Sequence, residues 1–398
     1  MRLDTLELRG FAAGGEIEVP CDRIDTALDD LWRAMARKLA QGAAAPGSGS
    51  VGATARAAAR LESVHRACLL NLVVHAGDST SEVVARFLAS SLTDRFPARI
   101  LLVRARPEEP GEGPPHAFVA ASRTPEAEGH AAQVAGELVI LDARGAQLDR
   151  VPPVVRAALE PDLATTLWWT GAVPPRRPYV AALRDVADRV IVDSETIPDD
   201  SDVAHLFPPT GDCRLADLAW PRLAPWRIAI ARAFDPPGNR AFLREVDAVR
   251  VVLGAPGGKI PDASAAPLLA GWLATALRWR PCVRGAATAR SGERSVTFSC
   301  DDGGRAASFA IEPRRSAPPG VAEVTLAAGD ARFVFRRSPQ GLVEVSTPPG
   351  LAPVRPAPLR ELDAEEVLAA TLLATREDPI APESIRRAAE IGAALFGG

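Results

Sequence analysis

Leu69-Leu70-Asn71-Leu72-Val73-Val74-His75 is a short, almost continuous apolar run. Runs of this kind are typical of strands that are buried on both faces of a sheet. Segments with helical spacing separate this run from further short apolar runs. The alternation predicts an α/β domain with a largely parallel, helix-covered, Rossmann-like sheet. The predicted strands are 69–75, 99–103, 117–121, 138–142, 165–169 and 190–193, and the predicted helices are 81–92, 154–159 and 180–187.

The sequence pattern changes after Pro198-Asp199-Asp200. Two helical segments come first, and a series of strands separated by Gly- and Pro-rich turns follows, which is typical of an antiparallel meander. With two further helices, these elements predict an α+β C-terminal domain with an antiparallel sheet. The predicted helices are 215–234, 267–279, 364–375 and 382–396, and the predicted strands are 295–300, 306–311, 321–326, 332–336 and 343–346.

The N-terminal segment has its own organisation. Apolar residues between Ile24 and Leu39 fall on one helix face, and Asp22 stands where it can cap the first turn. Residues 41–54 are rich in Gly, Ala and Ser and predict a flexible connector. We therefore predict an amphipathic helix with a linker at 1–60, the α/β domain at 61–205 and the α+β domain at 206–398.

The composition of the 398-residue chain argues against several kinds of partner. A formal net charge of −4 leaves no basic field for nucleic acid. No signal-like apolar run follows Met1, and no later stretch reaches about 18 uninterrupted apolar residues, so we expect a cytoplasmic protein that does not contact a membrane. The five cysteines are odd in number and widely spaced, which predicts neither a disulfide framework nor a zinc site.

Two glycine-rich stretches resemble phosphate-binding loops but lack the context that such loops need. Residues 47–52 match G-x-G-x-x-G, yet a helix and an Ala-rich stretch precede them instead of a strand. Residues 254–259 are one residue short of a P-loop, and Ile260 stands where Ser or Thr belongs. The histidines form no metal-binding motif, and no Ser or Cys stands in a nucleophile motif. We therefore predict no cofactor, no metal site and no catalytic residue.

Two tryptophans end the predicted strand 165–169 and must point to opposite faces of the sheet. Residues just beyond the carboxyl ends of strands line the place where open α/β sheets bind ligands or partners. An Asp-Ser pair ends the next predicted strand and would share that edge. Alternatively, the tryptophans pack under helices and the Asp or Ser caps a turn. The candidate contact residues at this edge are Trp168, Trp169, Asp193 and Ser194.

The segment 217–227 is a second candidate contact region, because it packs two Trp and two Arg around two prolines. Trp and Arg are over-represented at interface hot spots, since they combine a large contact area with directional donors. Alternatively, Pro225 lies in the first turn of a helix and the tryptophans are buried. The candidate contact residues of this segment are Trp220, Arg222, Trp226 and Arg227.

Several segments of the chain, in their order, resemble the glucose-6-phosphate dehydrogenase assembly proteins, the OpcA family. The resemblance spans roughly 28–279 and is looser through the closing helices. Members of the family often carry a Cys-Glu pair on the strand before the tryptophans, whereas this chain has Gly136-Glu137. The segments that carry the resemblance are 31–33, 65–74, 161–169, 188–194, 217–227 and 271–273.

The resemblance implies a non-catalytic partner of glucose-6-phosphate dehydrogenase, which promotes the assembly or the allosteric activation of that enzyme in the oxidative pentose phosphate pathway. Such a partner acts by binding one state of the enzyme more tightly than another. The alternative is an enzyme or sensor that binds a sugar phosphate or nucleotide at the carboxyl edge of the α/β sheet. In that case Arg176, Arg177 or Arg222 would hold the phosphate. A small-molecule effector and redox control stay open.

Overall fold

The chain, seen here as a computed structural model, forms two compact units. The first contains the described residues up to Ile191 together with Cys213, and the second contains 192–196 and the described residues from Arg214 onward. The predicted segment 1–60 lies largely outside the described residues, and the predicted domain boundary near residue 206 stays a prediction. The structure describes residues 16–43, 68–77, 97–123, 135–173, 177–196, 213–255, 265–281, 287–288, 293–300, 306–360, 362–374 and 378–396.

The first unit is built on a sheet whose central strands are the apolar runs of the sequence. In β2 (Leu70–Ala76), every residue from Asn71 onward is buried. The predicted helix 81–92 lies outside the described residues. The other strands are β1 (Ile17–Val19), β3 (Ala98–Arg106), β4 (His116–Arg123), β5 (Ala135–Arg144), β6 (Thr165–Thr170) and β7 (Arg189–Val192), and the helices are α1 (Ile24–Ala43), α4 (Val151–Ala158) and α5 (Pro178–Arg184).

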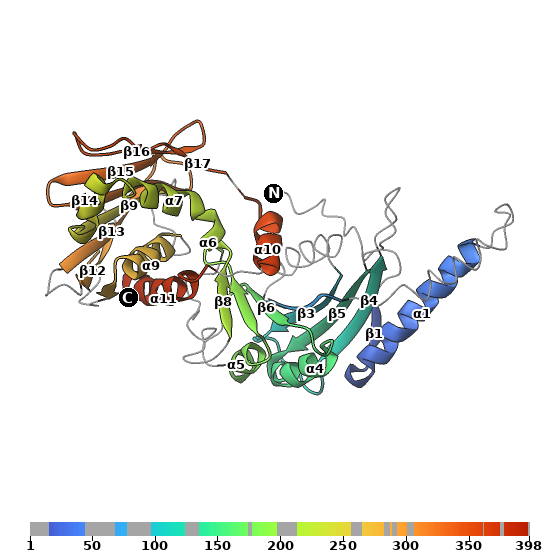
Figure 1. Cartoon of the computed structure of the whole chain (residues 1–398). Coiled ribbons are helices and arrows are strands. Elements are labelled where there is room, and N and C mark those ends of the chain that lie inside the picture. Colours follow the sequence, from blue (N-terminus) through green and yellow to red (C-terminus); the bar gives the residue numbers. More distant parts are fainter. Residues whose placement is uncertain are drawn as a thin grey trace. The chain divides into compact units, whose positions relative to one another are not determined.

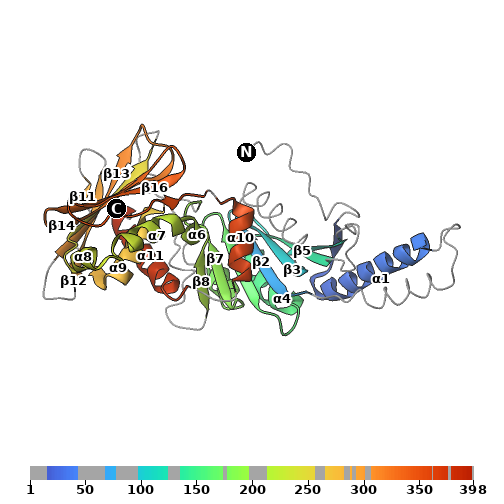
Figure 2. The same ribbon diagram turned by 45° about the horizontal axis from the view of Figure 1, so that its top comes forward.

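The central strands of this sheet run parallel. β2 pairs with β3 on one side and with β6 on the other, β3 pairs in turn with β5, and β6 pairs with β7. β4 lies antiparallel to β5, and β1 lies antiparallel to β4. Within the first unit these pairings give the order β1-β4-β5-β3-β2-β6-β7, and Figure 2 shows β2, β3 and β5 side by side. A largely parallel sheet is therefore confirmed, with an antiparallel extension at one edge.

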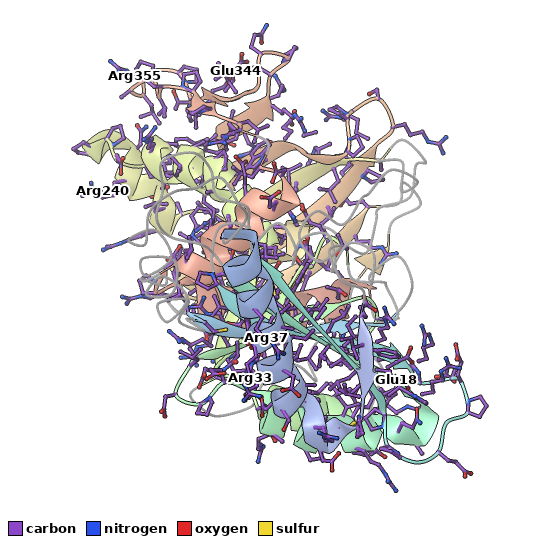
Figure 3. All side chains as sticks on the ribbon, turned by 90° about the vertical axis from the view of Figure 1, so that its right-hand side faces the viewer. Glu18, Arg33, Arg37, Arg240, Glu344 and Arg355 are labelled. Atoms are coloured by element: carbon purple, nitrogen blue, oxygen red, sulfur yellow. The ribbon has the colours of Figure 1, made fainter. Side chains whose placement is uncertain are left out.

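Helix α1 packs on the first unit through its N-terminal turns, where Ile24 and Leu28 are buried near β4. Its opposite side is charged, and Figure 3 shows Arg33 and Arg37 along it. The predicted amphipathic helix is therefore present. Asp22 does not precede it as a separate cap, because residues Cys21–Arg23 form a 3-10 helix that leads directly into α1.

The second unit combines a mixed sheet with helices. In β15 (Ala331–Arg337), Phe333 and Phe335 are buried while Arg332 and Arg336 are exposed, so one face of the sheet is apolar. Strand β8 (Arg214–Asp217) belongs to this unit but not to this sheet. The remaining strands of the sheet are β9 (Ala248–Gly254), β10 (Trp279–Pro281), β11 (Ala287–Thr288), β12 (Arg294–Cys300), β13 (Ala306–Arg314), β14 (Gly320–Ala328), β16 (Leu342–Ser346) and β17 (Ala357–Pro358). The helices are α6 (Ala219–Arg222), α7 (Ala224–Ala233), α8 (Pro237–Arg240), α9 (Ala266–Ala276), α10 (Ala364–Leu373) and α11 (Ala381–Phe396).

The second sheet, which runs in the order β10-β12-β13-β9-β14-β15-β16-β17, is not the predicted antiparallel meander. β9 inserts between β13 and β14, parallel to β13 and antiparallel to β14, and the other pairs are antiparallel. The predicted antiparallel sheet is therefore confirmed for the other pairs, but the predicted meander is wrong where β9 separates β13 from β14. A meander is inferred from the turns between consecutive strands. These turns do not show that β9, an earlier strand, pairs with β13 and β14.

Two predicted helix boundaries in this unit are also wrong. Residues 214–217 form strand β8, so the predicted helix 215–234 starts only at α6. Helix α9 ends at Ala276, and Trp279 begins β10 instead of continuing the helix. Arg278 between them has φ 57°, which is left-handed backbone that a right-handed helix cannot contain.

Candidate functional site

Three aromatic rings stack at the carboxyl end of the parallel strands of the first unit. The register of β2 and β6 places His75 beside Trp169, and their ring centroids lie 3.6 Å apart with an interplanar angle of 13°. Tyr179 of α5 adds a third ring, whose centroid is 6.0 Å from that of His75. None of the three side chains is more than 2% exposed, so the stack belongs to the core.

Each ring nitrogen of His75 lies near a polar group of the chain. Its Nδ1 lies 3.4 Å from the carbonyl oxygen of Thr170, which can only accept, so Nδ1 carries the proton. The Tyr179 hydroxyl lies 3.4 Å from Nε2. Burial raises the pKa of the Tyr179 phenol, which therefore stays protonated and donates to Nε2. Both ring nitrogens of His75 therefore lie within hydrogen-bond distance of polar groups of the chain.

The position of this stack matters because the strand order changes direction there. From β2 the chain continues to β3 and β5 on one side, then returns to β6 on the other. The carboxyl ends of β2 and β6 therefore mark the topological switch point, where open α/β sheets bind their ligands. Within the described residues, this position holds the chain's own rings. Trp168 points to the opposite face and is equally buried, so neither predicted tryptophan of this edge presents its ring to solvent.

A charged cluster follows β7 in the second unit and contains Asp193, Glu195, Asp217 and Arg222. The Nη1 atom of Arg222 donates to both carboxylate oxygens of Asp193, at 2.8 and 3.0 Å, and to Oε2 of Glu195 at 2.9 Å. Burial lowers the pKa of Arg222, but the bonds and charges of these two carboxylates outweigh it, and the pKa is raised. The predicted residues Asp193 and Arg222 are therefore brought together, and they satisfy each other's charge.

Asp217 is the third carboxylate of this cluster. Its Oδ1 atom accepts hydrogen bonds from the backbone N–H groups of Ser194, at 3.1 Å, and Ala219, at 2.9 Å. Burial, reinforced by the charge of Asp193, raises the pKa of Asp217 to about 7. Burial also raises the pKa of Glu195, against the opposing charge of Arg222. Arg222 thus pairs with Asp193 and Glu195, whereas Asp217 is held by backbone N–H groups.

The predicted segment 217–227 folds into α6 and α7 and buries both of its tryptophans. Arg227 lies over Trp220, with its Cζ atom 3.6 Å from the ring centroid. Asp378 accepts from Nε1 of Trp220 at 3.2 Å and from Nη1 of Arg227 at 3.0 Å. Trp226, on the inner side of α7, is 3% exposed. Proline in the first turn of the helix and buried tryptophans were one of the two alternatives, and the local structure follows it.

The solvent side of α7 nevertheless carries an apolar residue, Ile228, which is 44% exposed. It follows Arg227 directly in the chain, and Ala224 and Ala231 lie one helical turn to either side of it. Ile228 is not among the residues to which the sequence points, because Trp and Arg, and not Ile, are the residue types over-represented at interface hot spots. An isolated exposed apolar side chain is ordinary, whereas this one directly follows Arg227, whose guanidinium lies over Trp220.

A buried ion network at the amino end of the first sheet was also missed. Arg99 is 1% exposed, and its Nε donates to Oε2 of Glu137 at 2.7 Å. Its other nitrogens lie 3.0 Å from Oδ1 of Asp25 on α1 and 2.8 Å from Oε2 of Glu160. Trp32 of α1 donates to the second oxygen of Glu137 at 2.7 Å. The network joins α1 to β3 and β5, and it explains Glu137 as a structural partner of Arg99.

Two arginines of the phosphate-binding alternative each pair with a carboxylate of their own unit. Arg177 is exposed and lies 3.4 Å from Glu108, Arg222 belongs to the cluster described above, and Arg176 lies outside the described residues. Among the residues that the structure describes, no group of three His, Cys, Asp or Glu side chains could hold a metal ion. In the same part of the chain, no helix is both long enough and apolar enough to span a bilayer.

Comparison with known proteins assigns the family. Residues 89–206 match the family described as the N-terminal domain of a glucose-6-phosphate dehydrogenase subunit, and residues 213–385 match the family described as the C-terminal domain of that subunit. The chain belongs to the OpcA family. Both candidate regions lie inside these OpcA matches, the tryptophan edge in the first and the α6–α7 segment in the second.

Relatives named as OxPP cycle protein OpcA support the assignment. The protein of Nostoc punctiforme is 35% identical over 147 residues, which are 36% of this chain and 30% of the relative. That of Synechococcus elongatus is 28% identical over 217 residues, 54% of this chain and 47% of the relative. The match thus spans less than half of each relative's length.

Among solved structures, levoglucosan dehydrogenase in complex with NADH is similar to this OpcA chain at a TM-score of 0.45. The identity is 11%, and the match covers 82% of this chain and 96% of that chain. An oxidoreductase from Sinorhizobium meliloti gives a TM-score of 0.47 at 13% identity, with coverage of 82% and 96%.

Proposed function

We propose that this chain is a non-catalytic accessory protein that binds glucose-6-phosphate dehydrogenase and promotes its assembly or allosteric activation in the oxidative pentose phosphate pathway. The observation that carries the proposal is the pair of family matches, in chain order, to the two domains of a dehydrogenase subunit. The proposed setting is the cytoplasm, with the dehydrogenase as the partner and neither nucleic acid nor membrane.

The described chemistry of the switch point supports a role without catalysis. An enzyme that binds a dinucleotide or a sugar phosphate on an open α/β sheet needs space and hydrogen-bond donors beside the carboxyl ends of β2 and β6. His75, Trp169 and Tyr179 pack against one another there and use their polar atoms within the chain. These contacts favour an interaction protein over a sugar-phosphate sensor at this edge.

The contact with the dehydrogenase is proposed to lie on the solvent side of the α6–α7 segment. The rings of Trp220 and Trp226 are buried and would support this surface from below. Ile228 supplies exposed apolar area, and the side chains of Arg222 and Glu195, which are 21% and 32% exposed, are proposed to supply charge at its border. An apolar centre with a charged border is the usual anatomy of a protein interface.

The proposed activity is tested by mixing the purified chain with a cognate glucose-6-phosphate dehydrogenase. The expected result is a dehydrogenase with a lower KM, a higher kcat or a larger assembly by light scattering, while the chain alone has no dehydrogenase activity. Unchanged kinetics together with an unchanged elution volume of the dehydrogenase would exclude the proposed function.

The proposed surface is tested with a matched pair of substitutions. Ile228→Asp places a charge in the centre of the α7 surface and should weaken binding to the dehydrogenase by about tenfold or more. Leu373→Asp makes the same change at a side chain on α10 that is 50% exposed, and it should bind like the unsubstituted chain. Equal affinities of the two variants would remove α7 from the interface and leave the proposed partner untouched.

The phosphate-binding alternative has its own measurement. A thermal-shift titration of the chain with glucose 6-phosphate or NADP should give no change in Tm, because Arg222 is already paired with two carboxylates. A concentration-dependent rise of Tm with either ligand would favour the sensor, since a ligand that binds the native state stabilises it by mass action.

A further inference from the structure

One face of the second sheet is covered by helices and packs the core of its unit. α7 contacts β15, β16 and β17, α9 contacts β10, and α11 contacts β12. Figure 1 shows these helices on the same side of the strands. The side chains of this inner face are large and apolar, for example Phe309, Leu326 and Phe335.

The other face, here called the outer face, has no helix on it among the described residues. Because successive side chains of a strand alternate between faces, the register identifies its members. Residues that pair across neighbouring strands form rows on this face. The central row has one residue from each of six neighbouring strands, and a second row lies beside it. The central row is Ser295, Ala310, Arg250, Thr325, Val334 and Ser346, and the second row is Glu312, Val252, Glu323, Arg336 and Glu344.

The composition of the outer face resembles an interface more than a solvated surface. Its central row has only one charged side chain, Arg250, and the rest are small or β-branched. The charges gather in the adjacent row, where Arg336 lies 3.0 Å from Glu323 and Arg250 reaches 3.6 Å from Glu312. The charges thus lie along one side of a row that is nearly free of charge, and charge depletion at the centre is characteristic of protein interfaces, whereas the solvated face of an antiparallel sheet is polar.

The outer face is also large enough for a stable contact. β13 and β14 have nine residues each, so they are about 30 Å long, and six strands at about 4.8 Å spacing span about 24 Å between the outermost axes. The resulting area of about 700 Å² is close to the roughly 800 Å² that each partner buries in a standard interface.

The charges of the outer face are complementary to themselves. Glu312 and Arg336 lie in the same row, on opposite sides of the central β9–β14 pair. Glu312 is on β13, which is next to β9, and Arg336 is on β15, which is next to β14. Consider a two-fold axis that lies in the interface, runs parallel to the strands and passes between β9 and β14. It would place Glu312 opposite the partner's Arg336, and Arg336 opposite the partner's Glu312. We propose that the outer face of the second sheet is a self-association surface that packs against the same face of a second copy of this chain.

The test is a charge swap on the full chain, followed by analytical ultracentrifugation over a range of concentrations. The unsubstituted chain should be a dimer. Glu312→Arg and Arg336→Glu should each weaken the dimer by about tenfold or more, because each creates two like-charge contacts per interface. An equimolar mixture of these two variants should dimerise again, since each variant then meets the opposite charge. Arg240→Glu, an exposed position on α8 (Figure 3), should leave the dimer unchanged.

Several outcomes would overturn the proposal. These are a monomeric unsubstituted chain at every concentration, single variants that dimerise like the unsubstituted chain, and a mixture of folded variants that stays monomeric. Circular dichroism of each variant identifies those that are folded. A monomeric chain whose binding to the dehydrogenase is lost in Glu312→Arg would assign the outer face to the dehydrogenase instead.

Discussion

Arg227 lies over the indole ring of Trp220, and both side chains bond to the same carboxylate of Asp378. The three groups connect α6, α7 and the segment that leads into α11. Trp and Arg in one short segment are typical of interface hot spots, but here they mainly satisfy one another. The pair therefore stabilises the second unit and holds the α7 surface that carries Ile228.

Arg227→Met should destabilise the second unit. The substitution keeps an apolar chain over Trp220 but removes the cation–π contact and the ion pair with Asp378, together worth about 1–2 kcal/mol at a half-buried site. The expected result is a lower Tm in thermal unfolding followed by circular dichroism. Arg232→Met, at an exposed position of the same helix, should leave the Tm unchanged. Equal Tm values for both variants would mean that the stacked pair contributes nothing.

The raised pKa of Asp217 predicts that stability falls as pH rises. Because the folded-state pKa, about 7, exceeds the unfolded value of 3.8, the native state binds the extra proton between these limits. The stability contribution of protonated Asp217 is therefore complete below about pH 4 and is lost as pH rises through 7. A difference of about three pKa units sets an upper limit of about 4 kcal/mol on this loss.

Asp217→Asn tests this pH dependence, because the amide keeps an oxygen acceptor for the N–H groups of Ser194 and Ala219 and cannot ionise. The urea midpoint of the unsubstituted chain should fall from pH 5 to pH 8, and that of the variant should fall less. Parallel pH profiles for the two proteins would show that Asp217 does not titrate in this range.

Glu137→Gln should strongly destabilise the first unit. The substitution leaves Arg99 buried without its closest counter-charge, and breaking a buried pair in this way typically costs about 3–5 kcal/mol. Glu160→Gln removes a carboxylate that is 31% exposed and should cost much less. Urea unfolding followed by circular dichroism compares the two variants. A Glu137→Gln midpoint as high as that of Glu160→Gln would show that the network is not what fixes α1 to β3 and β5.

The local structure of both units could be predicted largely from the sequence. The strands of the first sheet are buried apolar runs, and β13 to β16 alternate apolar and polar residues, so burial itself produces these patterns. The position of β9 in the sheet could not be predicted, because the sequence around residues 248–254 does not specify which later strands pair with it. Strand β8 has only four residues, too few for a pattern of period two to be distinguished from a helix turn.

The candidate site shows the same division between local and long-range information. The sequence identified Asp193 and Arg222 separately, but their ion pair depends on the fold between them. Asp378 lies far from Trp220 in the chain, and only the packed structure reveals that it bonds to the indole. For Trp168 and Trp169, residue type and strand position fit a contact edge and a buried core equally well. Their burial under the chain's own elements decides between these interpretations for the rings themselves.

Gly271→Ala should separate two helices of the second unit. A methyl group at this position of α9 would lie 2.2 Å from the carbonyl oxygen of Ser384 and 2.7 Å from the amide nitrogen of Ala388 on α11. Both are backbone atoms, so the helices must move apart, and we expect a loss of about 2 kcal/mol or more despite the better helix propensity of Ala. Gly392→Ala on α11 is the matched control, because its methyl group would make only ordinary contacts, at 3.8 Å from Cβ of Pro267. That variant should gain about 0.5–1 kcal/mol from propensity alone. Urea unfolding of the two variants should therefore shift in opposite directions, and a shift of Gly271→Ala to higher urea would contradict the close packing of α9 on α11.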